Sequence, residues 1–281
     1  MENTLKHKKG LVFEGGGVLG ISYIGALEQL ESCGCKFESF IGSSIGSLYA
    51  AAMACHMNIS DMREYMMGLK LNKLKDNSSI FTGIYRLYNK YGWYSNKYLI
   101  KIVREMLDKA TGNPDITFSD IHKTYGTRLT ITSSSITVGK LILFDYNATP
   151  DMKVYEACVN SCTIPFYFET NGYVDGGLLN NYPIKYMNEL VGVENTLGLK
   201  IIQKNNKYGT VTSFYTFCEF IINTIIDAGV KVHISKVDWE NTIPINVSPN
   251  ISFIDFNISE EIKLNLIESG KESVIQYLNK N

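Results

Sequence analysis

The stretch LVFEGGGVLGISYIGALEQL (residues 11–30) joins an apolar run to three consecutive glycines and then to a helical pattern. Gly15, Gly17 and Gly20 satisfy G-x-G-x-x-G between a predicted strand and a predicted helix, which is the context of a dinucleotide-binding loop. Backbone N–H groups at such a turn stabilise any anion, whether a pyrophosphate or the oxyanion of an acyl transfer. The loop therefore predicts an anion site without identifying the anion.

Size and charge limit the class of protein. The chain has 281 residues, 45% of them hydrophobic, so we expect a single domain over residues 10–281 after an N-terminal tail at residues 1–9. The lysine-rich KHKK at residues 6–9 is expected to be solvated. Lys and Arg number 27 against 28 Asp and Glu, a net charge of -1. This balance predicts no nucleic-acid partner.

The cysteines and the chain start bear on compartment. The six cysteines form no Cys-x-x-Cys pair and no spacing that closes a zinc site with histidine, so we expect reduced thiols and no metal. The first residues are polar, and no uninterrupted apolar run of about 18 residues marks a membrane span. These features predict a cytoplasmic protein, with peripheral membrane association left open.

The order of predicted elements indicates the fold class. Residues 10–14 read as a buried strand, 20–32 as a helix, 37–41 as a strand and 45–54 as an Ala-rich helix. A βαβα start of this kind favours a parallel sheet covered on both faces.

Later segments extend this pattern. The patterns predict helices at 60–70, 96–110 and 259–279, a helix capped by TFSD (117–120), a hairpin around Gly139, a helix ended by Pro165 and a strand at 196–202. The aromatic segment 78–95 reads as irregular, and the apolar segment 213–226 as a core helix.

A nucleophile elbow is predicted at Gly42-x-Ser44-x-Gly46, between the strand at 37–41 and the helix at 45–54. The glycines let the strand and helix approach closely and leave the serine Oγ exposed on a sharp turn. The positive end of the following helix also points at the serine.

Candidates for the base that activates Ser44 are few. The histidines are His7, His56, His122 and His233. The order Ser44, Asp175, His233 matches an α/β-hydrolase, but that fold places its elbow deeper in the sheet, so we interpret the histidines as packing or surface residues.

Asp175 is the alternative base. It ends a strand in YVDGGLLNN, at a turn opened by Gly176 and Gly177. Because the unperturbed pKa of aspartate is about 3.9, such a base works best in an apolar pocket that raises it.

The glycine loop, the serine elbow and the later Asp-Gly-Gly, in this order, resemble the patatin-like phospholipases over about Gly10 to Ile184. GWYSNKYLIKIVREML, TFSDI, CVNSCTIPFYFE and YVDGGLLNNYP also resemble segments of that family. The resemblance implies a three-layer α/β/α sandwich with a mainly parallel central sheet. It also implies hydrolysis of lipid acyl esters at a membrane or micelle surface, without metal or cofactor.

The resemblance assigns roles to individual residues. Ser44 would be the nucleophile, Asp175 the base, and the N–H groups of Gly15, Gly16 and Gly17 the oxyanion donors. The supporting motif glycines are Gly20, Gly42, Gly46, Gly176 and Gly177. Leu19 departs from the pattern, because the family often has Lys or Arg at this position.

Two other functions stay open from the sequence. One is a dinucleotide-binding oxidoreductase of the Rossmann type, for which Glu38 supplies the acidic residue about 20 positions after the glycine loop. The other is a lipid-binding protein with a degenerate site, against which the intact Ser, Asp and glycine set argues.

Overall fold

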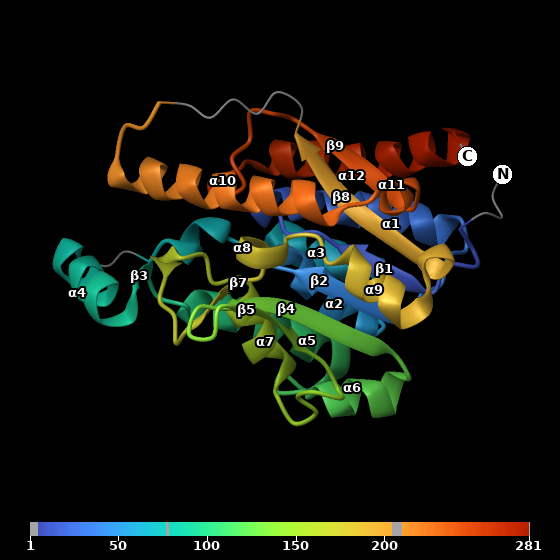
Figure 1. The fold of residues 1–281 in the computed structure, drawn as a ribbon, viewed down its shortest axis with the longest axis horizontal. Coiled ribbons are helices and arrows are strands. Elements are labelled where there is room, and N and C mark those ends of the chain that lie inside the picture. The colour runs from blue at the N-terminus through green and yellow to red at the C-terminus, as the bar shows by residue number, and fades with distance from the viewer. Residues whose placement is uncertain (1–4, 77–78, 204–209, 281) are drawn as a thin grey trace.

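The computed structural model describes residues 5–76, 79–203 and 210–280, and in helix α10 the side chains of residues 214, 215, 227 and 230–233 lie outside this description. Within these ranges a seven-stranded sheet has the order β5-β4-β2-β1-β8-β9, with β7 paired to β4 (Figure 1). Its strands are β1 Gly10–Phe13, β2 Ser39–Ser43, β4 Arg128–Ser135, β5 Lys140–Phe144, β7 Tyr173–Asp175, β8 Thr196–Gln203 and β9 Thr242–Val247. The pairs among β4, β2, β1, β8 and β9 are parallel, and β5 and β7 pair with β4 antiparallel.

The remaining elements surround this sheet. Strands β3 (Gly92–Tyr94) and β6 (Phe166–Phe168) form a separate parallel pair. The α-helices are α1 Ser22–Ser32, α2 Ile45–Ala54, α3 Ile59–Gly68, α4 Ile80–Lys90, α5 Lys97–Thr111, α6 Phe118–Tyr125, α7 Val154–Ser161, α8 Gly177–Asn180, α9 Ile184–Val191, α10 Phe214–His233, α11 Lys236–Glu240 and α12 Glu260–Lys280. Short 3-10 helices are η1 Gly17–Ile21, η2 Leu71–Leu74 and η3 Val193–Asn195.

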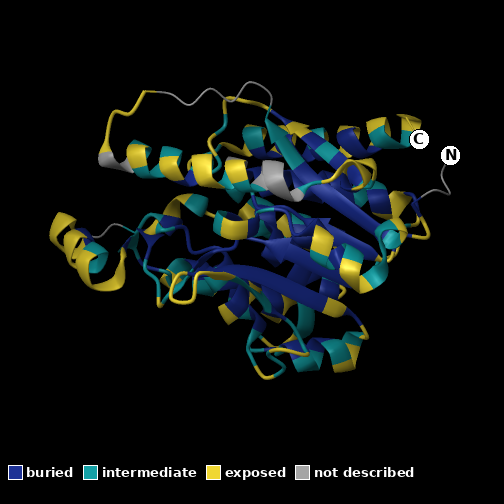
Figure 2. Ribbon diagram, viewed as in Figure 1, coloured by how far each residue is buried: buried dark blue, intermediate teal, exposed yellow. Residues whose placement is uncertain are grey.

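The sheet has an apolar core on each face. Leu11 and Phe13 of β1 face the larger core, which α1, α2, α5, α7 and α12 complete, whereas Val12 faces a smaller core under α9. This alternation follows from the two-residue period of a strand. Figure 1 shows α9 on the near side of the sheet and α2 on the far side, and Figure 2 shows the inner strands of the sheet largely buried. The predicted three-layer α/β/α fold with a mainly parallel sheet is confirmed.

Several local predictions are confirmed closely. Helix α2 has the predicted bounds, and the hairpin around Gly139 forms with Ser135 opposite Lys140. Thr117 and Asp120 form a capping box at α6, and Ser259 Oγ accepts the N–H of Ile262 at the start of α12. These elements carry their start and stop signals in their own residues.

Three expectations were wrong. Residues 80–90 of the segment expected to be irregular form helix α4. The segment 213–226 is helical but is not a core helix, because Phe217, Ile221 and Ile225 are exposed and Ile222 alone is buried among its described side chains. Lys8 is not solvated: it is buried and donates to the Glu194 carbonyl at 2.7 Å and to Asn241 Oδ1 at 2.6 Å.

The sequence interpretation also missed strands β3, β6 and β9. Strand β9 contains Pro244 and lies at the edge of the sheet, where the missing N–H of proline is tolerated. No helix among residues 5–76, 79–203 and 210–280 is long and apolar enough to cross a membrane.

Strands β2 and β7 meet end to end along β4. Ser43, the last residue of β2, pairs with Thr132, and Asp175, the last residue of β7, pairs with Ser133. Because β2 is parallel and β7 antiparallel to β4, their carboxyl ends point at each other. The fold therefore brings Ser44 and Asp175 together although 131 residues separate them.

Candidate active site

Ser44 occupies a strained turn between β2 and α2. Its backbone has φ 50° and ψ −130°, an unfavourable conformation for a residue with a side chain. Gly42 and Gly46 make the turn possible: a Cβ on Gly42 would lie 2.2 Å from the Gly46 carbonyl oxygen, and one on Gly46 would lie 2.6 Å from the Phe13 carbonyl oxygen. The elbow geometry expected from the sequence is thus present.

The side chains of Ser44 and Asp175 are in direct contact. Ser44 Oγ donates a hydrogen bond to Asp175 Oδ2 at 2.5 Å. The second carboxylate oxygen, Oδ1, accepts the N–H of Gly177 at 2.8 Å, and this bond fixes the carboxylate plane. The exposed fraction is 9% for Ser44 and 6% for Asp175, so the pair is shielded from bulk water.

Burial changes the acidity of Asp175. Removal from water raises the pKa of its carboxyl group from 3.8 to about 6, against the opposing effect of the hydrogen bonds from Ser44 and Gly177. A carboxylate with this pKa is a stronger base than a solvated aspartate and is still ionised at neutral pH.

Ser161 holds the elbow from α7. Its Oγ accepts the N–H of Ser44 at 2.8 Å. The sequence analysis gave Ser161 no role, although it lies in the CVNSCTIP segment, because a contact across 117 positions leaves no local pattern. Its hydroxyl fixes the direction in which the Ser44 backbone enters α2.

The glycine loop is tied to the segment that follows Asp175. The N–H of Gly15 donates to the Asn181 carbonyl at 3.0 Å, and Asn181 Nδ2 donates back to the Gly15 carbonyl at 3.1 Å. The N–H of Val18 donates to the Phe253 carbonyl at 2.8 Å. Among the described residues, the N–H groups of Gly16 and Gly17 have no acceptor.

A buried ion pair lies beside the loop. The Glu14 carboxylate accepts a very short contact from Lys200 Nζ and, through Oε2, the N–H of Ile201 at 2.8 Å. Burial raises the pKa of Glu14, and Lys200 opposes that shift. The sequence reasoning missed both residues. A charged residue next to or within an apolar strand segment could have indicated them: Glu14 directly follows β1, and Lys200 lies within β8.

These groups line a common cavity of about 210 Å³. Its walls include Ser44, Asp175, Gly15, Gly16, Gly17, Glu14, Lys200 and Asn181. A second, largely apolar cavity of about 470 Å³ shares Ile164, Pro165, Ile222 and Phe253 with the first. Leu19 lines the first cavity and is 3% exposed, so the position where the family often has a cation is filled by an apolar side chain.

The structure does not support the dinucleotide interpretation. Glu38 immediately precedes β2, and its N–H bonds to the carbonyl of Lys9, just before β1. Glu38 therefore lies at the amino ends of β1 and β2, whereas the glycine loop lies at their carboxyl ends. A ligand held by the loop would be out of its reach. The described residues that line the cavity include no histidine.

The chain is similar to proteins of one family. A family model described as patatin-like phospholipase matches residues 11–187. YqhO of Bacillus subtilis (strain 168), named as uncharacterized, is 29% identical over 292 residues, covering 95% of this chain and 97% of that protein. The probable lipid hydrolase 463L of Invertebrate iridescent virus 6 is 30% identical over 198 residues, 66% of each. The crystal structure of VipD from Legionella pneumophila has a TM-score of 0.65 at 20% identity, covering 98% of this chain and 67% of that one.

The chain is an α/β protein with a serine elbow, and the family model and the named lipid hydrolase place it in the lipid hydrolase class. The chain belongs to the patatin-like phospholipase family, because the family model matches more than half of it. The likeness to VipD concerns the fold alone. Family membership and the named lipid hydrolase support an enzyme that acts on lipids.

Proposed function

We propose that the protein is a lipid acyl hydrolase of the phospholipase A or lysophospholipase type that cleaves acyl esters through Ser44 and Asp175. One observation carries this proposal: Ser44 Oγ, on a strained elbow, donates to the buried Asp175 carboxylate at 2.5 Å. A serine nucleophile needs a base within hydrogen-bond reach, and Asp175 meets that requirement.

The reaction has two halves. Asp175 accepts the Ser44 proton as Oγ attacks the ester carbonyl carbon, and the protonated carboxyl then gives that proton to the departing alcohol. The C–O bond of the ester breaks, and an acyl group remains on Ser44. Asp175 next takes a proton from water, the resulting nucleophile attacks the acyl carbon, and Ser44 Oγ leaves with the proton.

The oxyanion donors in this proposal are Gly16 and Gly17. The family resemblance also implies Gly15 as a donor, but its N–H is bonded to the Asn181 carbonyl. Gly15 instead positions the loop, and Gly16 and Gly17 have N–H groups without acceptors among the described residues and line the same cavity as Ser44. Such donors stabilise charge that develops on the carbonyl oxygen.

The substrate class follows from the second cavity. Its lining includes Leu87, Trp93 and Tyr167 besides the shared residues Ile164 and Phe253. An apolar cavity that adjoins the nucleophile suits an acyl chain, because burying methylene groups supplies binding energy.

Fluorophosphonate labelling tests the proposal. The probe attacks activated serines, so we expect one label on the wild type and none on Ser44→Ala or Asp175→Asn. Ser43→Ala is the matched control and should be labelled like the wild type. Ser43 directly precedes Ser44, and its buried Oγ has no hydrogen-bond partner among the described residues. Equal labelling of Ser44→Ala would overturn the assignment. An unlabelled wild type would favour a degenerate lipid-binding site.

A further inference from the structure

Helix α4 presents its apolar side to solvent. Phe81, Ile84, Tyr85 and Tyr88 follow the i, i+3, i+4, i+7 spacing of one helix face, and all four are exposed. Phe81 is 85% exposed and Tyr88 83%, values that leave nearly the whole rings in water. Figure 2 shows α4 largely exposed, at one end of the molecule.

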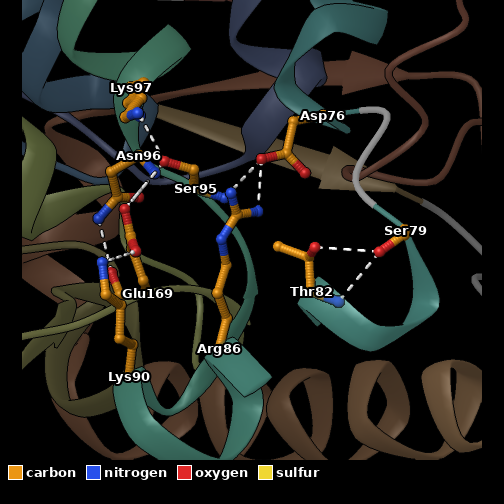
Figure 3. Close-up of polar contacts among 9 residues, drawn as sticks. All are labelled: Asp76, Ser79, Thr82, Arg86, Lys90, Ser95, Asn96, Lys97 and Glu169. Carbon is orange, nitrogen blue, oxygen red and sulfur yellow. Dashed lines mark hydrogen bonds and ion pairs between the residues drawn. The ribbon is translucent and has the colours of Figure 1, made fainter. Parts of the chain in front are cut away.

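The opposite side of α4 is fixed to the protein by polar contacts (Figure 3). Arg86 pairs with Asp76 at 2.5 Å, and Lys90 pairs with Glu169 at 3.0 Å. A Cβ on Gly83 would lie 2.4 Å from the Trp93 ring, so the helix backbone packs closely on that ring. The charged side chains of α4 thus bind it to the rest of the protein, and its apolar face is exposed to solvent.

The anchor of Lys90 is itself well supported. Glu169 Oε1 accepts the Ser95 hydroxyl at 2.9 Å and the Asn96 N–H at 3.3 Å. Asn96 Nδ2 also donates to the Glu169 carbonyl at 2.6 Å. These bonds hold the outward orientation of α4 relative to β6 and the start of α5.

The charge around α4 favours an anionic surface. Residues 70–90 contain Lys70, Lys73, Lys75, Arg86 and Lys90. The acids beside them are Asp76 and Glu169, which pairs with Lys90, so the net charge around α4 is +3 (5 − 2), whereas the whole chain has -1. Basic residues beside an apolar helix attract anionic lipid headgroups.

The position of α4 connects it with the substrate path. Leu87 of α4 and Trp93 line the apolar cavity that adjoins the Ser44 cavity. We propose that α4 is a docking helix for an anionic lipid bilayer, inserting Phe81, Ile84, Tyr85 and Tyr88 between the headgroups. This inference rests on the proposed function, since it names the surface from which that site takes its substrate.

Vesicle co-sedimentation tests the inference. The Ser44→Ala protein is mixed with vesicles of phosphatidylcholine and phosphatidylglycerol in equal amounts, so that binding is measured apart from hydrolysis. We expect it to sediment with the vesicles, more weakly at high salt, and Phe81→Ser/Tyr88→Ser to lower the affinity at least about tenfold. Unchanged melting temperatures would establish that the variants fold.

The matched control is Val237→Ser/Ile275→Ser. These two exposed apolar residues lie on α11 and on the C-terminal half of α12, at the far end of the molecule from α4 in Figure 1. We expect their substitution to leave vesicle binding unchanged.

The possible failures are distinct. No vesicle binding, or equal binding by the α4 variant, would overturn the docking helix even if the wild type hydrolyses lipids. A dimer in light scattering that Phe81→Ser/Tyr88→Ser converts to monomer, without loss of vesicle binding, would assign the face to a second copy instead. Lost binding in the α4 variant together with an inactive wild type would overturn the proposed function and leave the docking helix standing.

Discussion

Ser44 and Asp175 stand at the ends of two strands that point at each other along β4. Consecutive β4 residues, Thr132 and Ser133, pair with Ser43 and Asp175 respectively. Sheet pairing along β4 therefore brings Ser44 Oγ and Asp175 Oδ2 to hydrogen-bond distance. Two local bonds complete this arrangement: the Gly177 N–H donates to Asp175 Oδ1, and Ser161 Oγ accepts the N–H of Ser44.

The pH dependence of hydrolysis should follow Asp175. Its carboxyl group must be ionised to accept the Ser44 proton, and burial raises its pKa to about 6. We expect kcat/KM for a soluble ester to fall tenfold per pH unit below about pH 6 and to be level above about pH 7. A profile that stays level down to about pH 4.5 would contradict this role for the Asp175 carboxylate.

The same shift makes Asp175 costly to stability at neutral pH. The folded protein retains the Asp175 proton up to about pH 6, and the unfolded chain only up to about pH 3.9. The stability that protonated Asp175 contributes is therefore fully present below about pH 4 and is lost as the pH rises through 6. We expect Asp175→Asn to raise the free energy of unfolding at pH 8 by up to about 3 kcal/mol. Urea denaturation at pH 4 and pH 8 measures this, and an equal effect at both would contradict it.

The ion pair of Glu14 and Lys200 should be sensitive to loss of one partner. Lys200→Met leaves the buried Glu14 carboxylate unpaired, and we expect it to lower the free energy of unfolding by about 3–5 kcal/mol. Glu14→Gln/Lys200→Met should recover most of that loss. The exposed pair Lys101–Glu105 is the control, because Lys101→Met should cost less than about 0.5 kcal/mol. Additive effects of the Glu14 and Lys200 substitutions in denaturation experiments would exclude a coupled pair.

The glycine loop, the proposed source of the oxyanion donors, should not tolerate a side chain at Gly17. The φ of Gly17 is +54°, and a Cβ there would lie 2.0 Å from the Phe253 carbonyl oxygen. We expect Gly17→Ala to lower kcat about 10²-fold or more by moving the loop. Gly139 also has a positive φ, +66°, but no atom lies within 4 Å of its Cβ position, so Gly139→Ala should retain activity. Equal kcat values for Gly17→Ala and Gly139→Ala would contradict a role for the glycine loop in catalysis.

The parts of the site that sequence reasoning reached are local or family-specific. The elbow follows from Gly42, Ser44 and Gly46 within one strand-turn-helix. Asp175 is a candidate base from its place at a strand end in an Asp-Gly-Gly turn, and the family resemblance assigns it that role. Leu19 departs from the family pattern, and in the structure it is buried as part of the larger hydrophobic core.

The sequence reasoning missed the Glu14–Lys200 pair, which depends on long-range strand pairing, and helix α4, whose apolar face is exposed rather than buried. Glu14 meets Lys200 because Phe13 pairs with Leu199, and no local periodicity encodes the pairing of β1 with β8. Helix α4 has apolar residues at helical spacing. Such spacing normally indicates a helix face that packs on the core, whereas this face is exposed. The aromatic segment that contains Gly83 was therefore interpreted as irregular.

Lipid hydrolysis by the wild type and by Ser44→Ala tests the central claim most directly. Mass spectrometry of products from mixed phospholipid and lysophospholipid vesicles should show free fatty acid released by the wild type. Folded Ser44→Ala and Asp175→Asn proteins should each release less by a factor of at least about 10⁴. Fatty acid release by either variant at the wild-type rate would contradict hydrolysis through this serine and aspartate.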